Sequence, residues 1–193
     1  MSEVGYVGLR GSPSSNGDPF YFSSFCVILF IMMEFTPEKF NEIKHNAENF
    51  YNKIGSVYSS YFKENINFNI KGWDHLIFKS WNRTRPIADQ FNRLRHIELA
   101  PKVIDQSRTL QGVWATQKFE RTKKKDGGWQ QILKLTTYYE FIAVMESHSS
   151  KVRVKVIVKQ IDGGEKFFLS IIPFWGVDKK GDRIMHSGNP END

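Results

Sequence analysis

The feature that most constrains the fold is a pair of alternating segments, residues 151–161 and 166–173, joined by Asp162-Gly163-Gly164. Alternation of apolar and polar residues is typical of a half-buried β-strand, and Asp-Gly or Gly-Gly between two such runs is a strong hairpin signal. A two-residue loop at Asp162-Gly163 or at Gly163-Gly164 leads to the same two faces. One of them is predicted to be the dry core face, and it consists of Val152, Val154, Val156 and Val158 with Phe167, Leu169 and Ile171.

The opposite face of this hairpin is predicted to be cationic. It carries Arg153, Lys155, Lys159 and Ser170, interleaved with Ile157, Phe168 and Ile172. Three charges of one sign repel one another unless an anion is present, and the apolar neighbours indicate that the face is partly covered. This pattern favours a phosphate-rich ligand, although charged residues that alternate along a strand also typify a solvent-facing surface.

Composition indicates one ordinary globular domain. The chain has 193 residues, of which 40% are hydrophobic and 25% charged, and this length is enough for a sizeable core. Its 27 basic and 21 acidic residues give a net charge of +6, which permits a polyanionic partner without requiring one. The single cysteine, Cys26, excludes an intrachain disulfide framework and a cysteine-based metal site. We therefore expect a reducing, cytoplasmic location.

Residues 1–33 differ in composition from the rest of the chain. A segment rich in Gly, Ser and Pro is followed by an apolar run from Phe20 to Met33. That run is short for a transmembrane helix, and with only Arg10 before it the segment lacks the basic start of a signal peptide. We expect an extension or arm here and no membrane partner. The single domain should occupy residues 34–176, followed by a polar tail over 177–193.

The remaining periodicities predict helices first and strands afterwards. Thr36-Pro37-Glu38 is a helix start, and apolar residues three or four apart predict a helix of about 25 residues, which Gly55 could interrupt. A short strand over 66–70, a short helix over 73–79 and a helical stretch over 85–105 follow, with Pro101 as a candidate break. Residues 110–121, 130–146, 151–161 and 166–173 predict strands. The fold class is therefore α+β, with N-terminal helices packed on a C-terminal twisted antiparallel β-sheet of about four strands.

Several polar residues are candidates for chemistry. Histidine suits proton transfer near neutral pH, but a histidine in an apolar segment, such as His75, is more often structural. Glu140 is either a carboxylate base or the ion-pair partner of a hairpin cation, and we favour the ion pair. The arginines Arg83, Arg85, Arg93 and Arg95 suit bidentate phosphate binding, or they belong to a solvated helix face. No zinc-type spacing or nucleotide loop occurs, so we expect neither a cofactor nor a metal.

Four segments in order carry a resemblance to a known family. They are Gly72-Trp73-Asp74-His75, residues 139–144, residues 154–158 and the run Phe168-Leu169-Ser170-Ile171-Ile172-Pro173-Phe174-Trp175. Within residues 66–175 this arrangement resembles the BECR superfamily of barnase-, EndoU-, colicin- and RelE-like ribonucleases, which includes toxin and phage-associated branches. The resemblance implies metal-independent RNA cleavage, in which the ribose 2′-OH attacks the adjacent phosphate and leaves a 2′,3′-cyclic phosphate.

The resemblance also implies residue roles. His75 would be the acid/base group, Arg153, Lys155 or Lys159 the phosphate clamp and Ser170 a phosphate-binding hydroxyl. Arg83 and Arg85 are further candidates for binding RNA phosphate on their own chemistry, beside Arg153 and Lys159. Glu140 is a possible alternative acid/base group. Phe167 and Phe168 stand where many relatives place a histidine, so the second proton-transfer group is not assigned. RNA and, for a toxin, a cognate inhibitor or antitoxin protein are the implied partners. Two other interpretations remain: a non-catalytic nucleic-acid-binding module, and a protein-interaction or inhibitor domain.

The boundary at residue 33 leads to a first prediction. A chain that starts at Met33 should keep its fold and activity, because the first clear element begins at the Thr36-Pro37 helix start. The melting temperatures of the full and shortened chains, compared side by side, check this. A large decrease on truncation would show that the apolar run belongs to the core.

Overall fold

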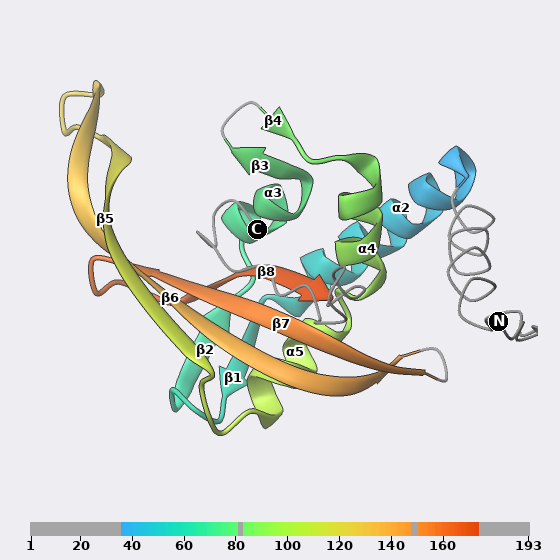
Figure 1. Cartoon of the computed structure of the whole chain (residues 1–193). Coiled ribbons are helices and arrows are strands. Elements are labelled where there is room, and N and C mark those ends of the chain that lie inside the picture. Colours follow the sequence, from blue (N-terminus) through green and yellow to red (C-terminus); the bar gives the residue numbers. More distant parts are fainter. Residues whose placement is uncertain (1–35, 81–82, 148–149, 174–193) are drawn as a thin grey trace, which may run out of the picture. The chain divides into compact units, whose positions relative to one another are not determined.

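The computed structural model describes residues 36–80, 83–147 and 150–173, and they form an α+β domain (Figure 1). The extension expected over residues 1–33 and the tail expected over 177–193 lie outside these ranges. In chain order the elements are α2 Pro37–Ile54, β1 Ser56–Ser59, β2 Glu64–Asn67, α3 Ile70–Ile77, β3 Phe78–Ser80, β4 Arg83–Thr84, α4 Ile87–Arg95, α5 Leu99–Gln106, β5 Gly112–Lys123, β6 Trp129–Ser147, β7 Ser150–Ile161 and β8 Phe167–Pro173.

The main sheet is larger than expected and is mixed rather than antiparallel. Its six strands follow the order β1-β2-β8-β7-β6-β5, and β3 and β4 form a separate two-stranded sheet. All neighbours in the main sheet are antiparallel except β2 and β8, which run parallel and meet at Asn67 and Phe167. The α+β class with helices mainly in the N-terminal half is confirmed. The prediction of an antiparallel sheet of about four strands is wrong.

Of the two additional strands in the main sheet, β2 overlaps the short strand predicted over 66–70. Strand β1 forms because the first helix is shorter than its periodicity predicts. Helix α2 ends at Ile54, and Gly55 follows with a φ of 65°, a left-handed conformation that glycine adopts without steric cost. The chain then extends into β1, and the Gly55 carbonyl accepts a hydrogen bond of 2.8 Å from the Phe68 amide. Residues 56–59, which continue the helical spacing of apolar residues, therefore pair with β2 instead.

The C-terminal hairpin contains the expected turn but has a different register. Asp162 and Gly163 have φ values of 52° and 70°, as a two-residue turn of this hand requires. Pairing between β7 and β8 nevertheless begins only at Lys159 and Phe167, and the register shifts between Ile157 and Val158. Such a bulge moves side chains to the other face.

The bulge divides the hairpin's apolar residues between two cores. Phe168 and Ile171 pack with the valines of β7 and with residues of the helices in the larger core. Phe167 and Leu169 instead belong to a smaller cluster on the other side with Tyr138, Ile157 and Ile172. The prediction of the dry face was therefore correct for the valines and Ile171 and wrong for Phe167 and Leu169.

Helix α3 approaches β8 closely, and Gly72 makes this approach possible. A Cβ atom at this position would collide with the Phe168 carbonyl oxygen and the Tyr51 hydroxyl. The ring of Phe168 stacks on that of Phe68, with centroids 4.7 Å apart. Because α3 lies against β8, a side chain in the last turn of α3 can contact other residues that pack on β8.

The larger core leads to a second prediction. Val156 is fully buried, whereas Val144 on the neighbouring strand is 60% exposed. Val156→Asp should lower the free energy of unfolding by about 3 kcal/mol or more, because a carboxylate would replace apolar contacts in a site without water. Val144→Asp, the matched control, should change it by about 0.5 kcal/mol or less. Urea denaturation of both variants measures this, and equal effects would contradict the assignment of the faces.

Candidate functional site

A chain of polar side chains links α3, α4 and β8, and its centre is Asp89. The Asp89 carboxylate accepts hydrogen bonds from two guanidinium groups, with Oδ2 3.3 Å from Arg85 Nη1 and Oδ1 3.1 Å from Arg93 Nε. Both arginine side chains are buried, while the Asp89 side chain is 39% exposed. Arg85, Asp89 and Arg93 are four residues apart, the spacing that brings side chains together along a helix.

Arg85 connects this ion pair to His75. Its Nε donates to the His75 carbonyl oxygen at 2.9 Å, and its Nη2 lies 3.4 Å and 3.5 Å from the two ring nitrogens of His75. Near-equal distances to both nitrogens indicate that the guanidinium lies across the imidazole rather than on one nitrogen. The imidazole is therefore held against a cationic group.

Arg93 connects the same carboxylate to Ser170. Its Nη1 donates to the Ser170 hydroxyl oxygen at 2.6 Å, a short bond as expected for a charged donor. Ser170 lies in the centre of β8, whose seven residues are all buried. Four residues named as candidates from the sequence, His75, Arg85, Arg93 and Ser170, thus come together through Asp89. We call this group the His75–Ser170 cluster.

Local structure explains why Asp89 carries its charge here. It lies in the first turn of α4, where backbone N–H groups and the helix dipole favour an anion. Burial raises the pKa of the Asp89 carboxyl, but the charges and hydrogen bonds of Arg93 and then Arg85 outweigh it, so the pKa lies below its usual value. Asp89 is consequently a weak base and a strong positioning group.

The cations predicted on the hairpin face are covered by carboxylates. Lys155 Nζ lies 3.4 Å from Glu140 Oε1, and Lys159 Nζ lies 3.4 Å from Glu120 Oε1. Both lysines are buried. Glu140 therefore forms the ion pair that the sequence analysis favours. The pairing of Ile157 with Ser170 makes Lys155 a diagonal neighbour of Ser170 on this face.

Two other predicted phosphate ligands, Arg83 and Arg153, are not members of this contact chain. Arg83 is exposed on the short strand β4. Arg153 is partly exposed on β7, opposite Val144 on β6. The structure therefore brings together only some of the cations that the sequence analysis assigned to phosphate binding.

Sequence reasoning missed two residues that build the cluster. Asp89 was not among the candidates, although its place midway between Arg85 and Arg93 is a visible signal of helical ion pairing. Gln90 was not among them either; its side-chain amide donates to the Arg85 carbonyl oxygen at 2.8 Å and is buried. Nothing in the sequence around Gln90 marks it for this contact, because it depends on the chain bend before α4.

A second polar feature lies near the start of α3. A groove of about 310 Å³ is bordered by basic residues from three elements, Lys71, Arg121 and Lys134, and by Glu120, Glu165 and Phe167. Lys71 lies one helical turn before His75 on α3. The groove therefore places positive charge at the surface close in sequence to the buried histidine.

The chain was compared with protein-family models, curated protein sequences and solved structures, and none of the three comparisons gives a match. The site is thus interpreted from its own chemistry. Within residues 36–80, 83–147 and 150–173, no group of three or more His, Cys, Asp or Glu side chains is arranged to hold a metal ion. None of the helices in these ranges is long and apolar enough to cross a membrane.

The cluster leads to a third prediction. Asp89→Asn should destabilise the protein at pH 7 by about 1–3 kcal/mol, less than for a fully buried pair because Asp89 is partly exposed. A carboxyl whose folded pKa is depressed contributes stability above its unfolded pKa of about 3.9, and this is lost as the pH falls through the folded value. The stability difference between wild type and Asp89→Asn should therefore shrink at low pH.

Urea denaturation at pH 7 and at successively lower pH measures this difference. Asp105→Asn, which removes an exposed carboxylate on α5, is the control and should have little effect at any pH. If the stability difference between wild type and Asp89→Asn stays unchanged at the lowest pH, the stabilisation by Asp89 does not come from its ion pairs.

Proposed function

We propose that the protein is a metal-independent endoribonuclease and that the His75–Ser170 cluster is its reaction centre. The observation that carries this proposal is the direct contact chain from His75 through Arg85, Asp89 and Arg93 to Ser170. An imidazole, two guanidiniums and a hydroxyl are the groups that transfer of an RNA phosphate uses. They come from α3, from α4 and the residue before its N-cap, and from β8, which is distant from both helices in the sequence.

The chemistry assigns a role to each group. The ribose 2′-oxygen forms a bond to phosphorus, the bond from phosphorus to the 5′-oxygen breaks, and a proton passes from the attacking to the departing side through acid/base groups. His75 is the proton-transfer group. Arg85 and Arg93 stabilise the charge on the non-bridging phosphate oxygens, and Ser170 donates a hydrogen bond to one of them. Asp89 positions the two guanidiniums, because its depressed pKa makes it a poor base.

A second candidate function rests on a specific observation, the burial of the cluster. His75 is 8% exposed, Arg85 and Arg93 are each 2% exposed, and Ser170 has no exposed surface. A network this enclosed suits a structural clamp that holds α3 and α4 on β8. In that case the protein binds RNA without cutting it. The first candidate function includes a toxin that a cognate inhibitor protein holds inactive. The second candidate function corresponds to a non-catalytic RNA-binding module.

The fourth prediction separates the two candidates. His75→Ala should lower the rate of RNA cleavage in EDTA by about 10²–10⁴-fold, the usual contribution of a positioned acid/base group. DNA should not be cleaved, because it lacks the attacking 2′-OH. Single-turnover cleavage of a labelled RNA, with detection of the 2′,3′-cyclic phosphate end, measures the reaction.

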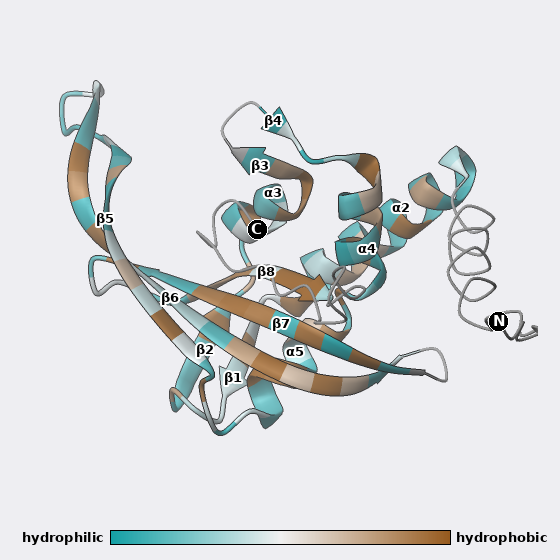
Figure 2. Cartoon of the chain, viewed as in Figure 1, coloured by the Kyte–Doolittle hydropathy of each residue, from teal (hydrophilic) through white to brown (hydrophobic). Residues whose placement is uncertain are grey.

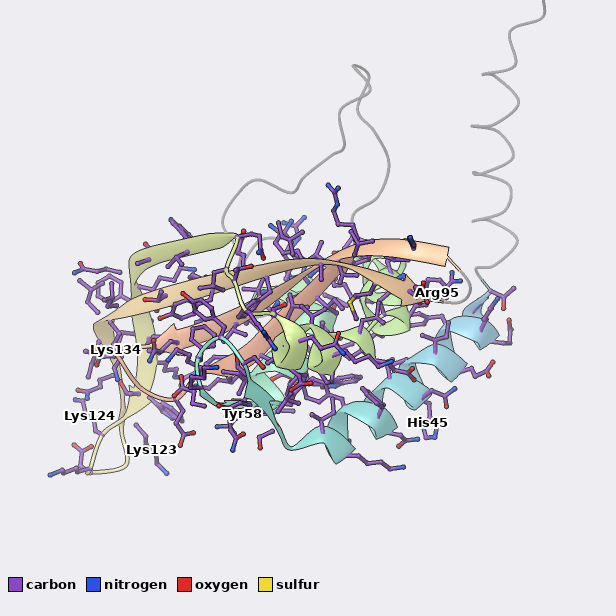
Figure 3. All side chains as sticks on the ribbon, turned by 90° about the horizontal axis from the view of Figure 1, so that it is seen from below. His45, Tyr58, Arg95, Lys123, Lys124 and Lys134 are labelled. Atoms are coloured by element: carbon purple, nitrogen blue, oxygen red, sulfur yellow. The ribbon has the colours of Figure 1, made fainter. Side chains whose placement is uncertain are left out.

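His45→Ala is the matched control, because His45 lies exposed on α2 (Figure 3), where its ring contacts the neighbouring Asn49 side chain. It should leave the rate unchanged. Circular dichroism of both variants checks that the fold is kept. Full activity of His75→Ala would remove His75 from the mechanism. A wild-type protein that binds RNA but leaves it intact would support the second candidate, and activity abolished by EDTA would contradict both the metal-free reaction and its centre.

A further inference from the structure

Strands β5 and β6 form a two-stranded ribbon that extends past the rest of the sheet (Figure 1). The partner strand β7 pairs with β6 only from Thr136 onward, opposite Ile161. Residues 117–123 of β5 and 129–135 of β6 therefore pair with each other and with no other strand in the described sheet. This part of β5 and β6 is therefore a two-stranded arm, which we call the β5–β6 ribbon.

One face of the ribbon exposes large apolar side chains, interleaved with polar and basic ones. The cross-strand pairs Phe119–Leu133 and Lys123–Trp129 lie on the same face, because they are four residues apart along each strand. Phe119 is 69% exposed, Trp129 57% and Leu133 49%. Figure 2 shows hydrophobic segments on this arm between hydrophilic ones. Exposed apolar side chains that lie next to one another on a surface are typical of a binding site.

The ribbon also carries most of the chain's excess positive charge. Residues 112–135 contain six basic side chains, Lys118, Arg121, Lys123, Lys124, Lys125 and Lys134, against two acidic ones, Glu120 and Asp126, whereas the whole chain has 27 against 21. Lys123 and Lys124 lie at the turn end of the ribbon in Figure 3, and Lys134, which pairs with Lys118, lies further back along it; all three are away from Arg95 and His45. The Arg121 guanidinium lies 4.5 Å from the centre of the Trp129 ring.

Edge protection explains only part of this pattern. Lysines on a long edge strand such as β5 prevent pairing with other chains. Edge protection does not require the rings of Phe119 and Trp129 on the open face, where they add apolar surface. Basic side chains interleaved with exposed rings are instead the combination that binds the phosphates and bases of a single strand.

We propose that the β5–β6 ribbon binds single-stranded nucleic acid, with bases stacked on Trp129 and Phe119 and phosphates contacted by Lys123, Lys124 and Lys125. The two rings lie about 14 Å apart along the ribbon, from a rise of about 3.4 Å per residue, so one strand contacts both. Arg121 and Lys134 of the ribbon also border the groove that contains Lys71 of α3. The preference for RNA over DNA rests on the proposed function. The inference that this surface binds single-stranded nucleic acid does not depend on that function.

Equilibrium binding of a 2′-O-methyl RNA oligonucleotide to the full chain in EDTA tests the proposal. This probe cannot be cleaved because its 2′-oxygen is blocked, so the result is independent of the reaction at His75. Trp129→Ala and Phe119→Ala should each weaken binding about tenfold or more. Tyr58→Ala, which removes an exposed ring on β1 (Figure 3), is the matched control and should bind as the wild type does.

A charge variant makes the test independent of the ribbon's fold. The double variant Lys124→Gln/Lys125→Gln alters the turn at the ribbon end rather than the strands. It should weaken binding and reduce the slope of log affinity against log salt by about 0.7 for each phosphate that the protein no longer neutralises. The control Lys53→Gln/Lys102→Gln removes the same charge from two exposed helix positions and should keep the wild-type slope.

Each outcome decides the proposal. Weaker affinity in the ribbon variants but not in the controls supports it, and a single-stranded DNA probe of equal length then shows whether the sugar matters. Equal affinity of Trp129→Ala, Phe119→Ala and Tyr58→Ala would overturn it. Binding of the probe that does not weaken as the salt concentration rises would also overturn it, because contacts between lysines and phosphates are salt-dependent. A wild type that does not bind the probe would overturn it as well, while cleavage of ordinary RNA would still support the reaction centre.

Discussion

The carboxylate of Asp89 holds together the part of the molecule that is of most chemical interest. It lies between two buried guanidiniums, and these in turn reach His75 on α3 and Ser170 on β8. Removing one partner from a buried ion pair leaves a charge with poor solvation, at a cost well above that of an exposed pair. The packing of α3 and α4 on β8 therefore depends on one anion in the first turn of α4.

Positive charge is distributed in two distinct ways in this protein. In the His75–Ser170 cluster and on the hairpin face, cations are buried and contact carboxylates, as Lys155 does with Glu140. On the β5–β6 ribbon, basic side chains lie at the surface beside exposed rings. Charge that contacts bulk water draws a polyanion from a distance, whereas enclosed charge acts only on a group already bound. A nuclease needs both kinds, and a binding module needs only the surface kind.

Part of this architecture could be predicted from the sequence because its signals are local. The four long strands appear within two residues of their predicted bounds, since alternation has a period that only a strand satisfies. Gly55 is a visible interruption of the first helical pattern, and α2 ends directly before it. The prediction of a helix over residues 56–59 is wrong. Their apolar spacing fits a helix, but pairing with β2, which the spacing does not report, makes them a strand.

The sequence by itself determined the α+β class, the positions of the long strands and the separation of the β7 valines from its cations. The tertiary structure decided how these parts combine. It placed β1 and β2 beside β8, moved Phe168 to the helix side through the bulge next to Ile157, and buried Arg85 and Arg93 around Asp89. The physical reason is that periodicity reports which face of an element is apolar, whereas the partner of a buried charge is set by residues that approach from elsewhere in the chain.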